Sequence, residues 1–301
     1  MKAKKYVLLY NGVKQINDIG RCEIMLETYE FTGYNFYSSQ LDMNLITSIV
    51  ECLKEILEED KKQAQPLFLQ VRDGFIMDIA RKVVQEKKKT FLIGITGESA
   101  SGKTVFVDNT VHACVKDNKD GIYTVIRQDD YYKDTSKELE DAGSYEALFQ
   151  TGFSFDTPDV IDLELMREHL MCLKSGTAIV SPKYDFKTCV SDINGEIKKP
   201  AKVILAEGLY VLNREVRDIM DVKVYVFTPL NVVKDRWYRR AESRGKTGKA
   251  ADLQYADVNK TAQMYIRPNY GIADCIINGM VTQEYIQEIT DKILTRLSEI
   301  C

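Results

Sequence analysis

The sequence predicts an α/β fold with a mainly parallel sheet, preceded by a smaller N-terminal α+β domain. After about residue 90, short apolar runs alternate with helical patterns, which is typical of a parallel sheet flanked by helices. One of these runs, FLIGIT, leads directly into the loop GESASGKT and then into a helical pattern. With 301 residues, of which 45% are hydrophobic and 29% charged, the chain is long enough to bury one large core or two smaller ones.

Charge and cysteine usage narrow the classes of function. The chain carries 45 acidic and 41 basic residues, a net charge of -4, so it has no overall basic field to hold nucleic acid or an anionic membrane. Its seven cysteines include no CxxC pair, which favours free thiols and argues against a structural zinc. No apolar stretch is long enough to be a membrane span or a signal peptide. We expect a cytoplasmic protein that forms a homo-oligomer and has no nucleic-acid or membrane partner.

The first 89 residues predict a separate domain of unknown role. The segment KYVLLYNG predicts a short buried strand, and residues 41–59 place apolar side chains on one helical stripe. A second helical pattern runs from about Asp73 to Lys89 and ends in the charged run QEKKK, which is typical of a linker. The predicted domains are therefore 1–89 and 90–301.

The second domain reads as strands and helices in alternation. The predicted strands are FLIGIT, YTVIRQ, VILAEG and VKVYVF. The predicted helices start at about Gly102, cover 162–174, and follow residue 231 in a long charged stretch.

The loop from Gly97 to Thr104 matches G-x-x-x-x-G-K-[ST] in full, with the preceding strand and following helix that this motif requires. Backbone amides of such a loop converge on phosphate oxygens at the positive end of a helix. Lys103 is expected to bridge the outer phosphates of a nucleoside triphosphate, and Thr104 to bind Mg²⁺. The expected nucleotide-binding residues are Gly97, Glu98, Ser99, Ala100, Ser101, Gly102, Lys103 and Thr104. A glycine turn that merely opens a helix is the alternative.

Three further stretches carry candidate functional residues. In QDDYYKD, Asp129 follows a predicted strand, at the edge where open parallel sheets hold ligands, and is a candidate base. In ILAEGL, Glu207 ends another apolar strand, where a carboxylate helps to hold magnesium. The stretch DRWYRRAESRGKTGK concentrates cations suited to closing over transferred phosphate charge, although a basic helix is more often a solvated face.

These stretches, in this order, make the chain from about residue 90 to 280 similar to the uridine kinases, which belong to the P-loop superfamily that also holds phosphoribulokinases and pantothenate kinases. The matching segments are GESASGKT, QDDYYKD, FSFDTPDVID, SPKYDF, VILAEGL, EVRD and TPLNVVKDRWYRRAESRGK. The resemblance implies an ATP- and Mg²⁺-dependent kinase that phosphorylates the 5'-hydroxyl of a nucleoside. By the same match Asp129 is the base and Glu207 the magnesium acid, while Arg239 and Arg244 belong to a catalytic lid. The residues implied to face the nucleoside are Tyr132, Phe155, Asp156, Tyr184, Phe186 and Arg236.

The sequence departs from the family pattern after YDF. Where the family places a base-reading histidine and then an arginine, this chain has Cys189 and Ser191. Cys189 is interpreted as a small apolar filler of a reshaped pocket, with a reactive thiol as the alternative. Lys246 replaces the last arginine of the lid motif and lacks its planar fork. Base selectivity is therefore expected to be altered.

Two alternatives stay open. In the first, the protein is a kinase whose acceptor is another small alcohol, such as pantothenate or a sugar phosphate. The adjacent pair Trp237–Tyr238 is similar to one in bacterial pantothenate kinases. In the second, the protein is a nucleotide-binding regulatory module that binds ATP without turnover.

Overall fold

The computed structural model describes residues 6–9, 12–15, 33–84, 90–116, 122–245 and 247–300. Side chains are described within these ranges from residue 43 onward, except at positions 115, 116 and 250. The chain divides into two compact units, Met1–Leu41 and Asp42–Cys301.

The first unit contains an antiparallel hairpin of β1 (Tyr6–Leu9) and β2 (Gly12–Gln15). The strand predicted in KYVLLYNG corresponds to β1. The helix α1 (Gly33–Asp60) begins in this unit and ends in the second.

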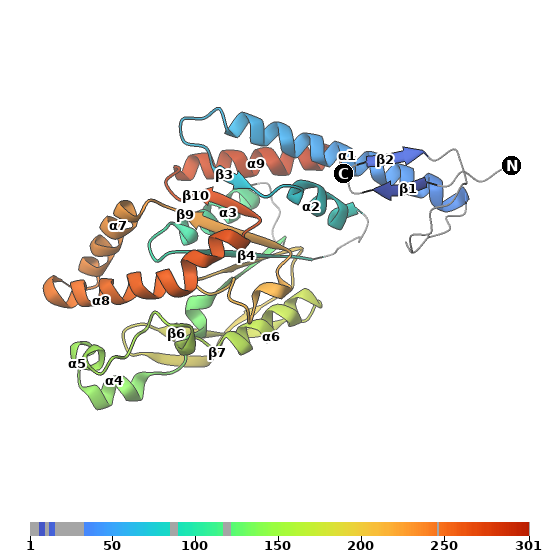
Figure 1. Cartoon of the computed structure of the whole chain (residues 1–301). Coiled ribbons are helices and arrows are strands. Elements are labelled where there is room, and N and C mark those ends of the chain that lie inside the picture. The colour runs from blue at the N-terminus through green and yellow to red at the C-terminus, as the bar shows by residue number, and fades with distance from the viewer. Residues whose placement is uncertain are drawn as a thin grey trace, which may run out of the picture. The chain divides into compact units, whose positions relative to one another are not determined.

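The second unit is built on a six-stranded sheet in the order β3-β10-β9-β4-β8-β5 (Figure 1). Its strands are β3 (Phe68–Val71), β4 (Phe91–Gly97), β5 (Tyr123–Arg127), β8 (Val203–Glu207), β9 (Val222–Phe227) and β10 (Cys275–Asn278). All neighbouring strands pair in parallel except β3, which pairs antiparallel with β10 at one edge. The predicted mainly parallel α/β fold is confirmed.

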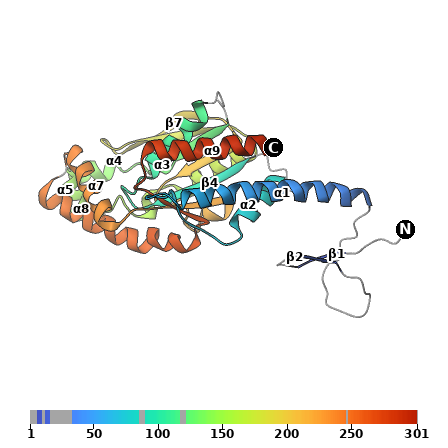
Figure 2. The ribbon, with the colours of Figure 1, turned by 90° about the horizontal axis from the view of Figure 1, so that it is seen from above.

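Helices cover both faces of this sheet because its central strands are apolar on both sides. On one face, α3 (Lys103–Lys116) and α9 (Gln283–Ile300) pack through a cluster that includes Val107, Val224 and Ile286 (Figures 1 and 2). On the other face, α6 (Leu163–Lys174) and the hairpin of β6 (Ile179–Asp185) and β7 (Val190–Lys198) build a second cluster.

The remaining elements lie between or beside these layers. The other helices are α2 (Phe75–Val84), α4 (Ser136–Ala142), α5 (Tyr145–Gln150), α7 (Leu230–Ser243) and α8 (Gly248–Thr261). Short 3₁₀ turns cover Gln128–Tyr131, Pro158–Val160, Arg217–Ile219 and Arg267–Ile272, and a π-helical turn covers Ala262–Ile266.

Residues 42–84 belong to the same unit as the sheet, so the division of the chain differs from the predicted boundary near residue 89. The end of α1 packs on α9, where Lys292 and Arg296 pair with Glu59 and Glu55. Residues 85–89, where the charged run suggested a linker, lie outside the described residues.

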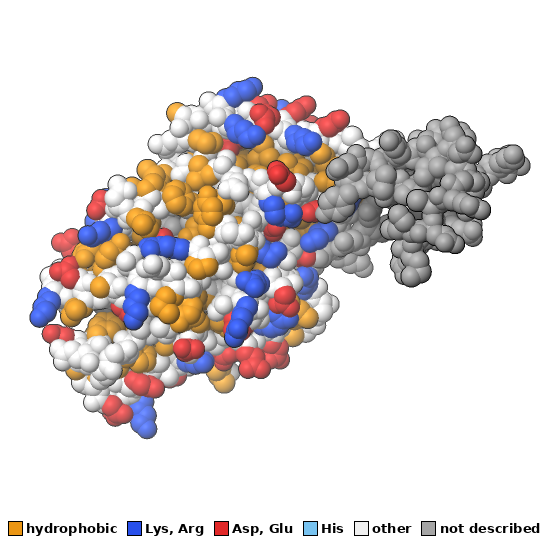
Figure 3. All heavy atoms as spheres, in the orientation of Figure 1, with side chains coloured by type: hydrophobic (Ala, Val, Ile, Leu, Met, Phe, Trp, Pro, Cys, Tyr) orange, Lys and Arg blue, Asp and Glu red, His pale blue; other side chains and the backbone are white. Residues whose placement is uncertain are grey.

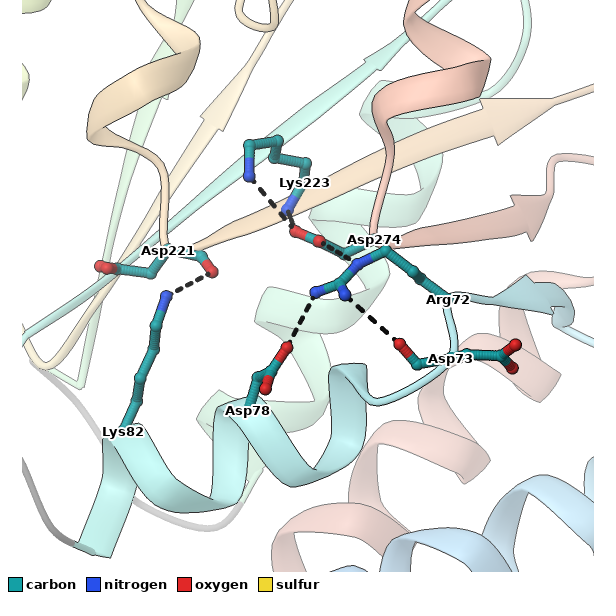
Figure 4. A network of polar contacts seen from close by, with 7 residues as sticks. All are labelled: Arg72, Asp73, Asp78, Lys82, Asp221, Lys223 and Asp274. Carbon is teal, nitrogen blue, oxygen red and sulfur yellow. Dashed lines mark hydrogen bonds and ion pairs between the residues drawn. The ribbon is translucent and has the colours of Figure 1, made fainter. Parts of the chain in front are cut away.

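A polar network fastens the segment after β3 to the start of β9 and β10 (Figure 4). The guanidinium of Arg72 donates to Asp274 Oδ1 and to Asp78 Oδ2, both at 3.1 Å. The other oxygen of Asp274 accepts from the Lys223 backbone at 2.9 Å. The buried carboxylate of Asp274 therefore ties the edge strand to the parallel strands.

The surface drawn in Figure 3 intersperses acidic and basic side chains rather than gathering one sign. Among the described residues, none of the helices combines the length and apolar character needed to cross a bilayer.

Candidate active site

The predicted phosphate loop connects β4 to α3, and its backbone takes conformations that favour glycine. Gly97 has φ 155° and Gly102 has φ 102°. A Cβ on Gly97 would lie 2.5 Å from the Val226 carbonyl oxygen, so the loop can approach β9 only with glycine here. The helix α3 begins at Lys103, which points the amides of its first turn into the loop.

A cavity of about 810 Å³ opens at the carboxyl ends of β4, β5 and β8. Its charged lining consists of Lys103, Arg127, Asp129, Asp156, Lys187, Glu207, Arg240 and Arg244. Its aromatic lining includes Tyr132, Tyr145, Phe155, Tyr184 and Phe186. The phosphate loop contributes Ser99, Lys103 and Thr104 to the same wall. One cavity thus joins a phosphate-binding end to an aromatic end.

Lys103 is held by the loop that it belongs to. Its ammonium group donates to the carbonyl oxygens of Gly97 at 3.0 Å and Glu98 at 2.9 Å. Burial lowers the pKa of Lys103 to about 8, partly opposed by the charges of Glu207 and Asp129. A phosphate placed beside this amine would favour its charged form.

Glu207 is the best candidate for a magnesium ligand or for holding a magnesium-bound water. The residue is 5% exposed, and its Oε1 accepts from Arg127 Nη1, its partner across the β5–β8 register. Its Oε2 is buried and has no hydrogen-bond partner among the described residues. Burial raises the pKa of Glu207, against the opposing charges of Arg127 and Lys103. A buried carboxylate oxygen near the Thr104 hydroxyl is the donor set that a hard cation prefers, so these residues fit Mg²⁺.

Asp129 lines the same cavity, and its charge acts both on Lys103 of the phosphate loop and on Tyr132 of the aromatic end. It belongs to the 3₁₀ turn that follows β5, and its side chain is exposed to the cavity. Its neighbour Asp130 does not line the cavity, and burial raises the pKa of Asp130.

The aromatic end is a box of packed rings. Tyr132 stacks on Tyr184 with ring centroids 5.0 Å apart, and Phe186 meets both rings edge-on. The Tyr132 hydroxyl donates to the Phe155 carbonyl oxygen at 3.0 Å. The carboxylate of Asp156 lines the cavity beside these rings.

Cys189 belongs to the same wall of the cavity as the aromatic box, and it is 1% exposed with φ 59°. Its Sγ is 3.3 Å from the hydroxyl of Tyr145, which also donates to the Phe186 carbonyl oxygen at 2.9 Å. The Tyr184 hydroxyl is 3.2 Å from Thr135 Oγ1. The polar groups at this end are thus engaged with protein atoms.

From α7, Trp237, Arg240, Ala241 and Ser243 line the cavity, and Arg244 lines it from the C-cap directly after the helix. The spacing of Trp237, Arg240, Ala241 and Arg244 keeps them on one side of the helix axis. Arg240 donates to the Ser99 hydroxyl at 2.5 Å. Burial and the charge of Arg244 lower the pKa of Arg240.

Residues 92–285 match the family model described as "Phosphoribulokinase / Uridine kinase family". The chain belongs to this family. A uridine kinase of Clostridium novyi (strain NT) is 34% identical over 215 residues, which cover 70% of this chain and 98% of that protein. A uridine kinase of Lactococcus lactis subsp. lactis (strain IL1403) is 33% identical over 216 residues, 70% of this chain and 100% of that protein. The chain is therefore a P-loop kinase, and the family match begins at the first strand of the parallel sheet.

Most site residues predicted from the sequence of this kinase meet in the cavity. Lys103, Thr104, Asp129, Tyr132, Phe155, Asp156, Tyr184, Phe186, Cys189, Glu207 and Arg244 all line it. In the phosphate loop, the Glu98 side chain turns away to Arg267, and Ser101 is buried.

Two predicted arginines do not line the cavity, although Arg236 lies beside the phosphate loop, with its Nη1 3.7 Å from the position of a Cβ on Gly102. Arg236 donates to the Gly279 carbonyl oxygen at 2.9 Å, and Arg239 is exposed and donates to the Asp235 carbonyl oxygen at 3.3 Å. Neither lines the cavity, whereas Arg240 does. The reason is helical phase, since one residue rotates a side chain by about 100° around the axis. Lys246 lies outside the described residues.

The predicted site left out several lining residues, among them Arg127, Tyr145 and Arg240, although Arg240 belongs to the basic stretch singled out in the sequence. The position of Arg127 at a strand end, two residues before Asp129, was a usable signal. The four-residue spacing of Arg240 and Arg244 was another. Tyr145 offered no local signal, because it comes from α5 and meets Cys189 only through the fold.

Proposed function

We propose that this kinase transfers the γ-phosphoryl group of ATP to the 5'-hydroxyl of a nucleoside, giving the nucleoside 5'-monophosphate and ADP. The observation that supports the proposal is that one cavity is lined by Lys103 of the phosphate loop, by Asp129 and by the rings of the aromatic box. Kinases of this kind work mainly by positioning the reactants and by stabilising charge.

In the proposed reaction the acceptor oxygen forms a bond to the γ-phosphorus, and the bond from this phosphorus to the β–γ bridging oxygen breaks. Asp129 orients the acceptor hydroxyl and takes its proton. Lys103, Arg240 and Arg244 stabilise the negative charge on the transferred group and on the leaving ADP. When bound, Mg²⁺ supplies further neutralisation of phosphate charge, and Thr104 and Glu207 would hold it directly or through water.

The aromatic box suits a planar base, because rigid rings offer large stacking surfaces at little cost in side-chain entropy. Asp156 can accept hydrogen bonds from vicinal ribose hydroxyls. These features favour a nucleoside over pantothenate or a sugar phosphate, which have no flat ring to stack.

We further propose that base selectivity is relaxed or shifted. Sites that read a base edge reject analogues strongly because buried polar groups would be left unpaired. Near Cys189, the hydroxyls of Tyr145 and Tyr184 already have protein partners. Stacking alone separates bases weakly.

The test is the rate of ADP formation with uridine, cytidine, adenosine, guanosine, inosine, thymidine, pantothenate and a sugar phosphate. Turnover of nucleosides, with a 2'-deoxy analogue used less efficiently than the best ribonucleoside, supports the proposal. Turnover of only a non-nucleoside alcohol contradicts it, and ATP binding without any turnover favours a regulatory module. A preference for uridine and cytidine over purines by several hundredfold contradicts the expected change in selectivity alone.

A further inference from the structure

The second residue of the phosphate loop carries a carboxylate, which is clamped from outside the cavity. Glu98 accepts from Arg267 through both oxygens, with Nε and Nη2 each at 3.0 Å. The side chains are only 12% exposed for Glu98 and 28% for Arg267. Neither residue lines the cavity. This two-pronged geometry is the strongest form of an ion pair between arginine and a carboxylate.

An acidic residue in this place is unfavourable for binding an anion. The loop has to attract a triphosphate, and an unpaired carboxylate a few residues away would repel it in a partly buried site where screening is weak. The negative charge of Glu98 acts on Lys103, where it opposes the effect of burial on the pKa of this amine. The positive charge of Arg267 cancels that of Glu98 at short range.

The backbone of Glu98 holds the catalytic lysine. Its carbonyl oxygen accepts from Lys103 Nζ at 2.9 Å and from the Ser101 amide at 3.0 Å. Fixing the Glu98 side chain therefore also fixes the carbonyl group that positions Lys103 and closes the turn of the loop.

Arg267 lies at the irregular end of a helix. The helix α8 ends at Thr261, and the chain continues as the π-helical turn Ala262–Ile266 and then as a 3₁₀ turn from Arg267. Arg267 follows these changes of helical pitch, and its Nη2 also donates to Asn259 Oδ1 of α8 at 2.6 Å. π-Helical turns are rare and are frequently found at functional sites.

We propose that Arg267 is a positioning residue for the nucleotide. It acts mainly by neutralising the carboxylate of Glu98 beside the phosphate loop, and it also links this loop to the end of α8. The inference rests on the proposed use of ATP by this site.

The test is nucleotide affinity, measured on the full chain by the fluorescence of mant-ATP with Mg²⁺ and by displacement with ATP. Arg267→Met should weaken binding on the order of tenfold or more, because it leaves the Glu98 charge unpaired in the loop. The double variant Glu98→Gln with Arg267→Met should return to within about threefold of the parent, since the repelling charge is gone.

The matched control is Arg167→Met, which breaks another two-pronged arginine pair, to Asp218 on the outer surface. It should leave mant-ATP affinity unchanged within twofold. Because Arg267→Met can fail to fold, Glu98→Gln alone is also measured. It leaves the Arg267 charge uncompensated near the loop and should bind mant-ATP as tightly as the parent chain or more tightly.

Several outcomes overturn the inference while leaving the proposed function intact. Parent-like affinity in Arg267→Met means that the clamp is not needed. A double variant as weak as Arg267→Met means that the pair acts only by holding structure and not by neutralising charge. A tenfold loss in Glu98→Gln alone also overturns it. Failure of the parent chain to bind mant-ATP at all would overturn the proposed function first and the inference with it.

Discussion

Replacing Asp60 by alanine tests whether residues 42–84 fold as part of the kinase unit. Asp60 is the last residue of α1 and is fully buried. Its carboxylate accepts from the backbone amides of Leu67 and Phe68, both at 2.8 Å, and from the Tyr285 hydroxyl of α9 at 2.7 Å. One side chain therefore joins α1, the start of β3 and α9.

The expected loss of stability follows from the donors that the variant leaves behind. A buried donor without a partner costs about 1–3 kcal/mol. Two backbone amides lose their acceptor, and the Tyr285 hydroxyl, closer to the surface, can turn to water. We therefore expect Asp60→Ala to lower the free energy of unfolding by about 3–5 kcal/mol. Tyr285→Phe removes a single hydrogen bond and should lower it by about 1–2 kcal/mol.

The assay is urea unfolding followed by far-UV circular dichroism and by mant-ATP binding in parallel. The control is Glu58→Ala, which removes an exposed carboxylate two residues before Asp60 and should leave the midpoint unchanged. In Asp60→Ala both signals should shift together, because β3 and α1 unfold with the sheet. A loss below 1 kcal/mol, or a circular dichroism shift without a shift in nucleotide binding, would refute this reasoning.

Three further predictions concern the proposed chemistry and the division of the chain. Asp129→Asn should retain mant-ATP binding but lower kcat about a hundredfold or more, the usual effect of losing a general base; near-normal kcat with saturating acceptor would exclude Asp129 from that role. Lys103→Ala should both weaken nucleotide binding and lower kcat, since its charge meets the phosphates before and during transfer, and parent-like values of both would remove the loop from the mechanism. A chain that starts at Asp42 should remain soluble and active, whereas one that starts near Lys87 loses β3 and the α1 and α2 partners of α9 and should aggregate; an active, monodisperse protein from the shorter chain would contradict this.

The phosphate loop and the strand ends could be predicted from sequence because their signals are local. Gly97 and Lys103 belong to one short motif, and Asp129 and Glu207 each follow an apolar run. Parallel strands bring their carboxyl ends to one edge, so residues far apart in sequence meet there. The strand register determines which of these residues are neighbours: Arg127 and Glu207 are direct partners across β5 and β8.

The rest depended on information that no short window contains. Arg239 and Arg240 are adjacent in sequence and point in different directions from the helix. A run of basic residues does not reveal which of the two faces the cavity. The edge strand β3 is only four residues long and joins β10 across about two hundred residues of sequence, so its membership of the sheet carries no local signature. Tyr145 and Cys189 are 44 residues apart in sequence, and their contact depends on the tertiary fold and not on a local sequence pattern.

The order of the strands separates the two tasks of the site. β4 is one of the two central strands of the sheet and pairs with β8, so the phosphate loop and Glu207 lie together, while β5, which leads to Asp129, is the edge strand beyond β8. In the proposed reaction the nucleotide therefore lies over the centre of the sheet and the acceptor enters from the β5 side. Because Arg127 bonds to both Glu207 and Asp108 of α3, it ties the end of β5 to the helix that follows the phosphate loop. In the proposed reaction this crosslink helps to fix Asp129 relative to the phosphate loop, while changes in the aromatic box can alter the acceptor without moving that loop.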